Sequence, residues 1–244
     1  MVLITGGTHG IGRACVERLA RDGRQVVFTG RDRTAGDALQ RAAAGSAYVP
    51  GNVAVEADCR HVVDEALRLG NGRLDGLVNN AGMSSRSPFA ESTAAEWDEI
   101  MAVNVRSAFL FTRFALGALA AVKGAVVNIS SIAGKMGEEG LAIYAASKAA
   151  MIGLTQSLAL EFGDQVRFNA VCPGQVATRM MKTISNDPVA KRKLELRIPA
   201  GRFAEPSEIA SVVAWLLSSQ ASYVNGAVIT ADGGETAGVR IPRT

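Results

Sequence analysis

Short runs of apolar, β-branched residues alternate with longer amphipathic segments along the whole chain. The apolar runs predict strands at 2–5, 25–29, 47–50, 76–78, 125–129, 166–171 and 227–230. Between them, helical periodicity predicts helices over 11–22, 56–69, 92–121, 142–162 and 205–218. Uniformly apolar strands that alternate with helices indicate a parallel sheet covered on both faces. We therefore expect an α/β fold, a doubly wound parallel sheet of about seven strands.

Length and composition narrow the class of protein. The chain has 244 residues, 48% hydrophobic and 20% charged, which suits one globular domain with a large core. No repeat, low-complexity segment or linker interrupts it, so residues 1–244 are interpreted as a single domain. A formal net charge of +3 and scattered arginines argue against a nucleic-acid partner.

Cysteine usage and the amino terminus bear on the compartment. The 3 cysteines are far apart and only 2 histidines exist, so neither a disulfide framework nor a metal site is expected. The chain begins in an apolar run without a positively charged n-region. No apolar run reaches the roughly 18 residues of a membrane span. We expect a cytoplasmic protein without a membrane partner.

A glycine-rich turn lies between the first predicted strand and the first helix. It reads Thr5-Gly6-Gly7-Thr8-His9-Gly10-Ile11-Gly12. Glycines let the backbone approach a ligand closely, and the helix directs free amides and its positive dipole end at a pyrophosphate. The turn therefore predicts nucleotide binding, with His9 as a further donor near a phosphate.

The end of the second strand bears on the choice of nucleotide. A carboxylate at this tip accepts from a ribose 2′-hydroxyl and repels a 2′-phosphate, but here Gly30 occupies the tip and Arg31 follows. A guanidinium suits a 2′-phosphate by charge and donor geometry. Either Arg31 binds that phosphate, or it is a solvated loop residue that Asp32 partly neutralises. We favour NADP over NAD.

Asparagines follow the third and fourth strands, at the sheet edge where open α/β folds bind ligands. Asn52 is expected to hydrogen-bond an adenine edge. Asn79 and Asn80 either contact the ligand or tie neighbouring strand ends together.

Tyr144 and Lys148 are the pair in which we expect the chemistry, because on a helix they lie one turn apart on the same face. A phenol normally titrates near pH 10, and an ammonium held nearby lowers that pKa. Ser131, at the end of the fifth strand, either donates to a substrate oxygen or forms a turn. Asn104, in an apolar helical stretch, either satisfies backbone groups at a helix distortion or holds a water in a proton path.

These motifs resemble those of the short-chain dehydrogenase/reductase family over nearly the whole chain, its 3-oxoacyl carrier-protein reductases included. The matching pieces, in order, are TGGTHGIG (5–12), NNAG (79–82), NV (104–105), SS (130–131), YAASK (144–148), CPG (172–174) and ADGG (231–234). The resemblance implies a Rossmann-fold enzyme that reversibly reduces a ketone or 3-oxo group of a small molecule with NADPH. The alternatives are an NAD-dependent dehydrogenase of a secondary alcohol or cyclic diol, and a non-catalytic dinucleotide-binding scaffold.

The resemblance also implies roles for single residues. Tyr144 is expected to be the general acid or base, and Ser131 to orient and polarise the substrate carbonyl. Lys148 is expected to hold the nicotinamide ribose and depress the pKa of Tyr144, and Asn104 to anchor the water of a proton relay. The expected cofactor-binding residues are Gly6, Thr8, His9, Gly10, Ile11, Gly12, Arg31, Asn52, Val53, Asn80, Ala81, Gly82, Tyr144, Lys148, Pro173, Gly174, Val176 and Thr178.

Three further expectations concern the surroundings of the site. Residues 179–200 are polar and charged; the resemblance implies a mobile substrate lid here, and a charged surface helix is the equal alternative. The helix carrying Tyr144 is apolar nearly all round, which predicts a homo-oligomer, tetramer or dimer. The expected pocket is formed by Met83, Ser84, Ser85, Met136, Leu141, Gln175 and the lid, and no charged clamp is evident among these residues. Glu138 and Glu139 could face solvent.

Overall fold

A seven-stranded parallel sheet forms the centre of the computed structural model, which describes residues 1–181, 184 and 186–238. Its strands run in the order β3-β2-β1-β4-β5-β6-β7. Their bounds are β1 (Val2–Ile4), β2 (Val26–Gly30), β3 (Ser46–Pro50), β4 (Gly76–Asn79), β5 (Ala125–Ile129), β6 (Arg167–Pro173) and β7 (Val228–Ala231). The order reverses between β1 and β4, so the predicted doubly wound Rossmann fold is confirmed.

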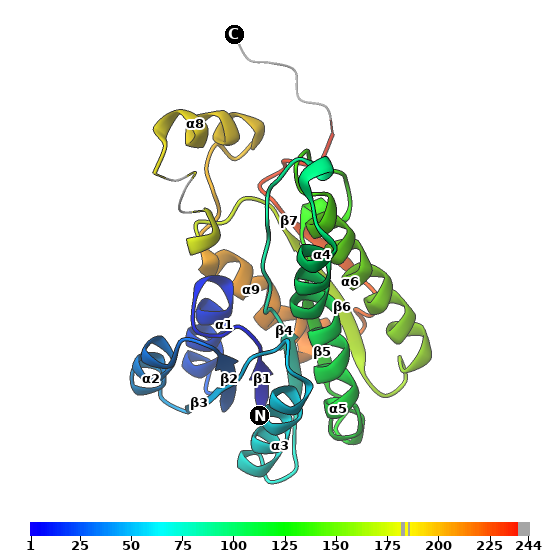
Figure 1. Cartoon of the computed structure of the whole chain (residues 1–244). Helices are drawn as coiled ribbons and strands as arrows, with labels where there is room; N and C mark the ends of the chain where they lie inside the picture. Colours follow the sequence, from blue (N-terminus) through cyan, green and yellow to red (C-terminus); the bar gives the residue numbers. More distant parts are fainter. Residues whose placement is uncertain (182–183, 185, 239–244) are drawn as a thin grey trace.

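Helices cover both faces of this sheet (Figure 1). One face carries α1 (Gly10–Arg21), α2 (Arg33–Ala42) and α9 (Pro206–Leu216). The other carries α3 (Glu56–Leu69), α5 (Ser107–Ala121) and α6 (Ala142–Glu161), with α4 (Ala94–Met101) next to α6. A further helix, α8 (Pro188–Arg197), lies apart from both layers.

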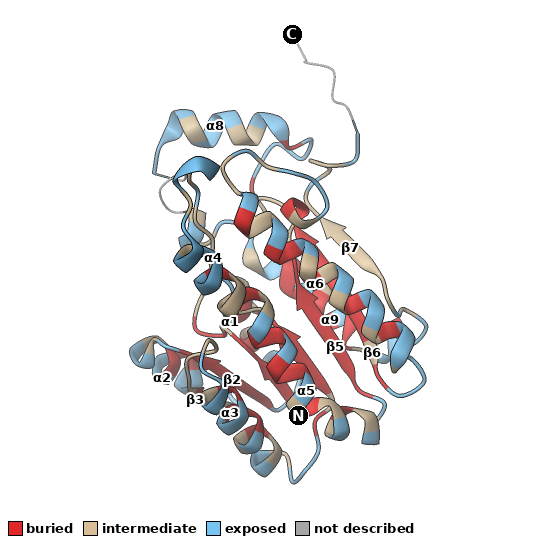
Figure 2. Cartoon of the chain, turned by 45° about the vertical axis from the view of Figure 1, so that its right-hand side comes forward, coloured by how far each residue is buried: buried red, intermediate tan, exposed pale blue. Residues whose placement is uncertain are grey.

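The two cores follow from the alternation of side chains along each strand. Ile4 and Phe28 pack on the α1 side, whereas their neighbours Leu3 and Val27 pack on the α3 side. Figure 2 shows buried strands between helices whose outer faces are exposed. Because both faces are covered, the strands read as continuous apolar runs, which is why the sequence located them.

Two helical segments differ from the sequence prediction. The pattern did not predict α2, in which only Gly36 and Leu39 are buried; Asp32 begins it by accepting from the amide of Ala35 at 3.0 Å. The helix predicted over 92–121 is interrupted by a π-helical turn, Ala102–Arg106, that contains the buried Asn104. Such turns are frequent at functional sites.

The helical stretch Ala94–Ala121 spans 28 residues and is, by length and composition, apolar enough to cross a membrane. Within the fold, 44% of its most apolar window is buried. Phe111, Ala115 and Leu119 pack into the core on the α3 side of the sheet. Packing in the core accounts for the buried part of this stretch.

Candidate active site

A cavity of about 1120 Å³ lies at the carboxyl ends of the strands. All of the expected cofactor-binding residues except Gly12 line it, and so do Ser131, Tyr144 and Lys148 among the expected catalytic residues. Asn104 does not, although the neighbouring Val103 does. The structure thus brings into one cleft residues that are spread from the first strand to the loop after β6.

The glycine-rich turn is held open toward the cavity by its own backbone and by the loop after β4. Gly6 and Gly10 have φ values of +64° and +54°, which favour glycine. Asn80 Nδ2 donates to the carbonyls of Thr5 and Gly6 at 2.9 and 3.1 Å, and Thr5 Oγ1 accepts from the amide of Asn80. Asn80 therefore both lines the cavity and fastens the turn.

Gly12 has a packing role instead of a place in the cavity. A Cβ atom here would lie 2.2 Å from the carbonyl oxygen of Gly6 and 2.4 Å from Asn80 Nδ2. Only glycine lets α1 approach the turn this closely, so Gly12 aims the first turn of α1 at the cavity.

Asn79 belongs to a buried polar chain that joins two strand ends to α5 and α6. Asn79 Nδ2 donates to Asn128 Oδ1 at 2.8 Å and to Thr112 Oγ1 at 3.1 Å, and Asn128 Nδ2 donates to Thr155 Oγ1 at 2.8 Å. All four side chains are buried. Of the two interpretations left open by the sequence, the structure supports the structural one for Asn79.

Ser131 and Tyr144 meet because the turn after β5 packs directly on α6. A Cβ atom at Gly134 would lie 2.6 Å from the backbone of Lys148, so the turn can approach the helix only at a glycine. A hydrogen bond links the Ser131 hydroxyl to the Tyr144 phenol. Ser131 Oγ also accepts from the amide of Ala133 at 3.1 Å. Ser131 thus forms the turn and faces the phenol.

The pKa of Tyr144 is raised above its ordinary value, mainly because the phenol is buried. The hydrogen bond with Ser131 lowers it, and the negative charge of Glu138 raises it further. This direction is opposite to the one expected from the Tyr144–Lys148 spacing. Burial outweighs any effect of Lys148, whose Nζ lies 5.7 Å from the centre of the Tyr144 ring.

Lys148 is itself buried, with 4% of its surface exposed, and burial lowers its pKa from 10.5 to about 8. Its Nζ donates to the carbonyl of Ile129 at 2.8 Å. The neighbouring Ser130 hydroxyl donates to the carbonyl of Lys148 at 2.8 Å. The ammonium is therefore fixed between the end of β5 and α6, at the wall of the cavity.

Asn104 supports the site from behind. Its Oδ1 accepts from the amide of Met83 at 2.8 Å, and its Nδ2 donates to the carbonyl of Met83 and to Ser147 Oγ, each at 2.9 Å. Ser147 in turn donates to the carbonyl of Tyr144 at 2.7 Å. Asn104 thus satisfies backbone groups beside a helix distortion, one of the two roles that the sequence left open, and it connects the loop after β4 to the helix of Tyr144.

The far end of the cavity carries the residues that bear on nucleotide choice. A Cβ atom at Gly30 would lie 2.7 Å from Thr8 Cγ2, so no side chain fits at the strand tip. Asp32 accepts from the amide of Ala35, and His9 Nε2 donates to its Oδ2 at 2.9 Å. These two bonds, in that order, hold the pKa of the Asp32 carboxyl below its usual range.

The opposite end of the cavity is lined by charged side chains, two of which lie outside the predicted lid. They are Arg86, Glu138, Lys193 and Arg197, the last two from α8. Ser84, Leu141 and Gln175 line the cavity as expected, whereas Met83, Ser85 and Met136 do not. Glu139 is exposed, but Glu138 faces the cavity, which corrects the expectation for this residue. Arg86 and Glu138 are far apart in the chain, so no local signal pairs them.

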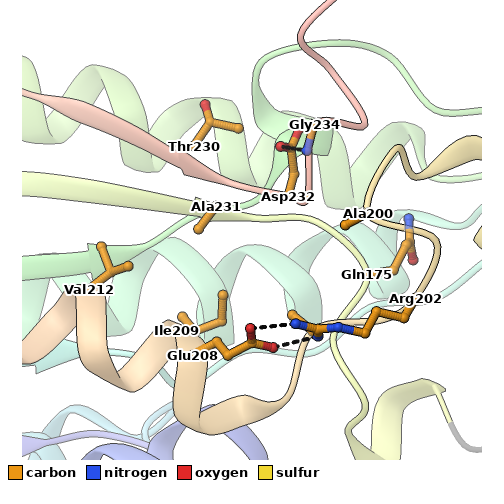
Figure 3. Close-up of a pocket in the computed structure, with 12 residues that line it drawn as sticks. Gln175, Ala200, Arg202, Glu208, Ile209, Val212, Thr230, Ala231, Asp232 and Gly234 are labelled. Atoms are coloured by element: carbon orange, nitrogen blue, oxygen red, sulfur yellow. Dashed lines mark hydrogen bonds and ion pairs between the residues drawn. The ribbon is translucent and has the colours of Figure 1, made fainter. Parts of the chain in front are cut away.

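A second, smaller cavity of about 360 Å³ lies between α9 and the end of β7 (Figure 3). Arg202 donates to both carboxylate oxygens of Glu208 at 2.7 and 2.8 Å. Glu208 also accepts from the amide of Glu205 as part of the capping box of α9. Both side chains are therefore engaged at the start of α9. Apart from Gln175, none of the individually predicted site and pocket residues lines this cavity.

Among the residues that the structure describes, no group of three or more His, Cys, Asp or Glu side chains is placed to hold a metal ion. Cys15, Cys59 and Cys172 are free and buried. The donors that the cavity does present are amides, hydroxyls, guanidinium and ammonium groups. Together with the glycine turn, they suit a phosphate-bearing dinucleotide.

Comparison with known proteins finds oxidoreductases that match nearly the whole chain. The family model described as Enoyl-(Acyl carrier protein) reductase matches residues 6–236. The chain is 37% identical to the meso-2,3-butanediol dehydrogenase of Serratia marcescens, over 97% of this chain and 94% of that one. It is 38% identical to the 3-oxoacyl-acyl-carrier-protein reductase of Aquifex aeolicus, over 95% of each. A putative gluconate dehydrogenase from Agrobacterium tumefaciens superposes with a TM-score of 0.92 at 28% identity, over 98% and 96% of the two chains.

Proposed function

Because the chain belongs to the short-chain dehydrogenase/reductase family, whose enzymes act on CH–OH and C=O groups with NAD or NADP, we propose that it is an NADPH-dependent reductase of ketone or 3-oxo groups. The observation that carries the proposal is the meeting of Ser131, Tyr144 and Lys148 in one cleft with the glycine-rich turn. Consumption of NADPH with a panel of ketones and 3-oxoacyl thioesters tests it. If the NADPH absorbance falls with none of these compounds, the proposal is overturned.

In this proposal, the bound nicotinamide supplies the hydride, and the protein supplies orientation and the proton. Ser131 Oγ accepts from Ala133 and hydrogen-bonds with the Tyr144 phenol, so its proton would turn from the phenol to the oxygen of a bound substrate. Tyr144 donates the proton that the reduced oxygen takes up. Its raised pKa keeps the phenol protonated at neutral pH, the form that reduction requires, whereas oxidation of an alcohol requires the phenolate and should become faster as the pH rises.

Lys148 and Asn104 are proposed as supporting residues. Lys148 presents a fixed ammonium at the cavity wall, suited to the hydroxyls of the nicotinamide ribose. A Cβ atom at Gly82 would lie 3.4 Å from Lys148 Nζ and 3.5 Å from Asn104 Oδ1, so the two side chains flank the same glycine. The anchoring of a relay water by Asn104 stays a prediction. The side-chain amide of Asn104 is already hydrogen-bonded to Met83 and Ser147.

We propose NADPH over NADH on the geometry beyond β2. Arg31 is exposed and lines the cavity, and among the described residues no carboxylate pairs with it. Asp32 is turned toward α2 and His9, so its charge is partly neutralised. Asp32 nevertheless lines the cavity as an ionised group, the feature that favours the runner-up, an NAD-dependent dehydrogenase of secondary alcohols or diols.

Replacing Arg31 by Gln is expected to reduce the ratio of kcat/KM for NADPH to that for NADH by roughly 10-fold or more, the loss of a charge-assisted hydrogen bond. Steady-state kinetics with both nucleotides measure the ratio. Arg33→Gln is the control, since Arg33 is exposed on the first turn of α2 and does not line the cavity. A wild-type preference for NADH, or an unchanged ratio in Arg31→Gln, would favour the runner-up.

We propose that 179–200 acts as a lid over the substrate end; residues 182, 183 and 185 of this segment lie outside the described residues. Met181, Ala190 and Leu194 line the cavity with apolar surface, and Lys193 and Arg197 add charge. Arg197 pairs with Glu235 at 2.9 Å, which ties the last turn of α8 to the segment after β7. A solvated surface helix would not place apolar side chains on the cavity.

We also place the enzyme in the cytoplasm, in keeping with three free cysteines.

We propose a homo-oligomer that packs through the outer face of α6. Small or apolar residues are exposed along this helix, among them Ala146, Gly153 and Leu160, the last 89% exposed. On the adjacent α5, Phe109 is 47% exposed. Light scattering at micromolar concentration is expected to give the mass of a tetramer or dimer, and a monomer would contradict the proposal.

A further inference from the structure

The substrate end of the cleft contains a carboxylate that the proposed proton transfer does not use. Glu138 lines the cavity with Ser131 and Tyr144, and 17% of its side chain is exposed. Its charge acts on Tyr144, the proposed proton donor, and on Glu235 beside the lid. Glu138 therefore lies within the electrostatic field of the reacting end of the cleft.

Arg86 holds this carboxylate in place from the loop after β4. Arg86 Nη2 donates to Glu138 Oε1 at 2.6 Å, and Nη1 donates to the carbonyl of Glu139 at 2.6 Å. The amide of Ser87 donates to the carbonyl of Gly140 at 3.1 Å, which joins the same two loops a second time. The position of the Glu138 side chain is thus set by two loops that meet at the mouth of the cavity.

The second oxygen of Glu138 keeps its hydrogen-bonding capacity. Within the described part of the chain, Oε1 accepts from Arg86 and nothing donates to Oε2. An ionised carboxylate can accept at both oxygens. Because the charge of Glu138 is already balanced by Arg86, the open oxygen suits a neutral donor better than a cation. A hydroxyl group is such a donor.

We propose that Glu138 determines substrate specificity by accepting a hydrogen bond from a second hydroxyl group of the substrate. The enzyme then acts on hydroxy ketones and the corresponding diols in preference to simple ketones. A ketone without this hydroxyl displaces water from Oε2 and offers no donor in return, which costs binding free energy. The inference rests on the proposed function, since it names the substrate class of the same site.

A pair of ketones that differ by one hydroxyl tests the inference: 3-hydroxy-2-butanone and 2-butanone. For the wild type, we expect kcat/KM for the hydroxy ketone to exceed that for the simple ketone by at least about 10-fold. In Glu138→Gln, the amide oxygen still accepts from Arg86, but an NH₂ group replaces Oε2, and the preference should fall by about 10-fold. The ratio cancels any change in the acidity of Tyr144, because both ketones use the same proton donor.

Glu139→Gln is the matched control. Glu139 is the next residue, its side chain is exposed, and it does not line the cavity, so its variant should keep the wild-type ratio. Thermal melting establishes that each variant is folded. The ratio of kcat/KM for the two ketones in the wild type is measured without any variant. A wild type without preference, or a Glu138→Gln variant that slows both ketones equally, would overturn the inference and leave the proposed function standing. If the wild type reduces neither of these ketones and no other carbonyl in the panel, the proposed function is overturned instead.

Discussion

Replacing Tyr144 by Phe is expected to lower kcat for ketone reduction by roughly 10²- to 10⁴-fold, the usual contribution of a positioned general acid. The substitution removes the proton that the substrate oxygen takes up and keeps the ring, so the walls of the cavity stay in place. Ser131 remains as a hydroxyl donor, but an aliphatic alcohol is too weak an acid to replace the phenol. Initial rates of NADPH consumption measure the loss.

Nucleotide binding separates this outcome from simple damage to the fold. Fluorescence titration with NADPH should give a dissociation constant close to that of the wild type. Tyr223→Phe is the control, because Tyr223 is fully exposed, at 101%, and should change neither rate nor binding. Near-normal turnover of Tyr144→Phe would refute the assignment of the proton donor.

Replacing Lys148 by Met is expected to lower activity while making the protein more stable at neutral pH. Burial lowers the pKa of Lys148 from 10.5 to about 8, so the folded state binds this proton less tightly than the unfolded state does. The shift corresponds to about 3 kcal/mol of destabilisation. Loss of the hydrogen bond to Ile129 offsets roughly 1 kcal/mol of the gain.

The pH dependence of this difference has a definite sign. Below about pH 8, the cost of the buried ammonium is present in full, and it is relieved as the pH rises from about 8 to 10.5. The stability advantage of Lys148→Met should therefore be largest at pH 7 and shrink across that window. Urea unfolding of both proteins at several pH values measures it. The exposed Lys135 provides a control variant, Lys135→Met, whose difference from the wild type should not follow this course.

The same substitution tests the role of Lys148 toward the nucleotide. If its ammonium holds the ribose, Lys148→Met should raise KM for NADPH as well as lower kcat. A variant that keeps both the activity and the pH profile of stability of the wild type would contradict the buried, charged position of Lys148. Stability gained together with activity lost is the pattern expected of a residue retained for function.

The inner strands β1, β2, β4 and β5 were predictable because every one of their residues is buried and most are apolar. The helix α2 was not, because only Gly36 and Leu39 are buried in it and its other positions are polar residues or alanine. Its start, with Asp32 as the capping residue, became evident only from the hydrogen bond to Ala35. Local pattern identifies an element when burial dominates its composition, and it fails at the exposed edge of the sheet.

The members of the candidate site were predictable from motifs, but some of their roles were not. Gly12 was expected in the nucleotide site, and the structure places it between α1 and the glycine-rich turn as a packing residue. The sequence allowed two roles for Asn79, and its hydrogen bonds to Asn128 and Thr112 decide for the structural one. A motif records which residue types occur together, whereas the contacts of each one depend on how distant segments pack.

By itself, the sequence determined the α/β class, the glycine-rich turn and the one-turn spacing of Tyr144 and Lys148, because these depend on local backbone geometry and on periodicity. Only the tertiary structure decided that the pKa of Tyr144 is raised, since burial depends on the layers around α6. It also decided that Glu138 faces the cavity, held by Arg86 from a loop more than fifty residues away. Electrostatics in a cleft follow from distances through space and from exclusion of water, and neither quantity can be read from residue order.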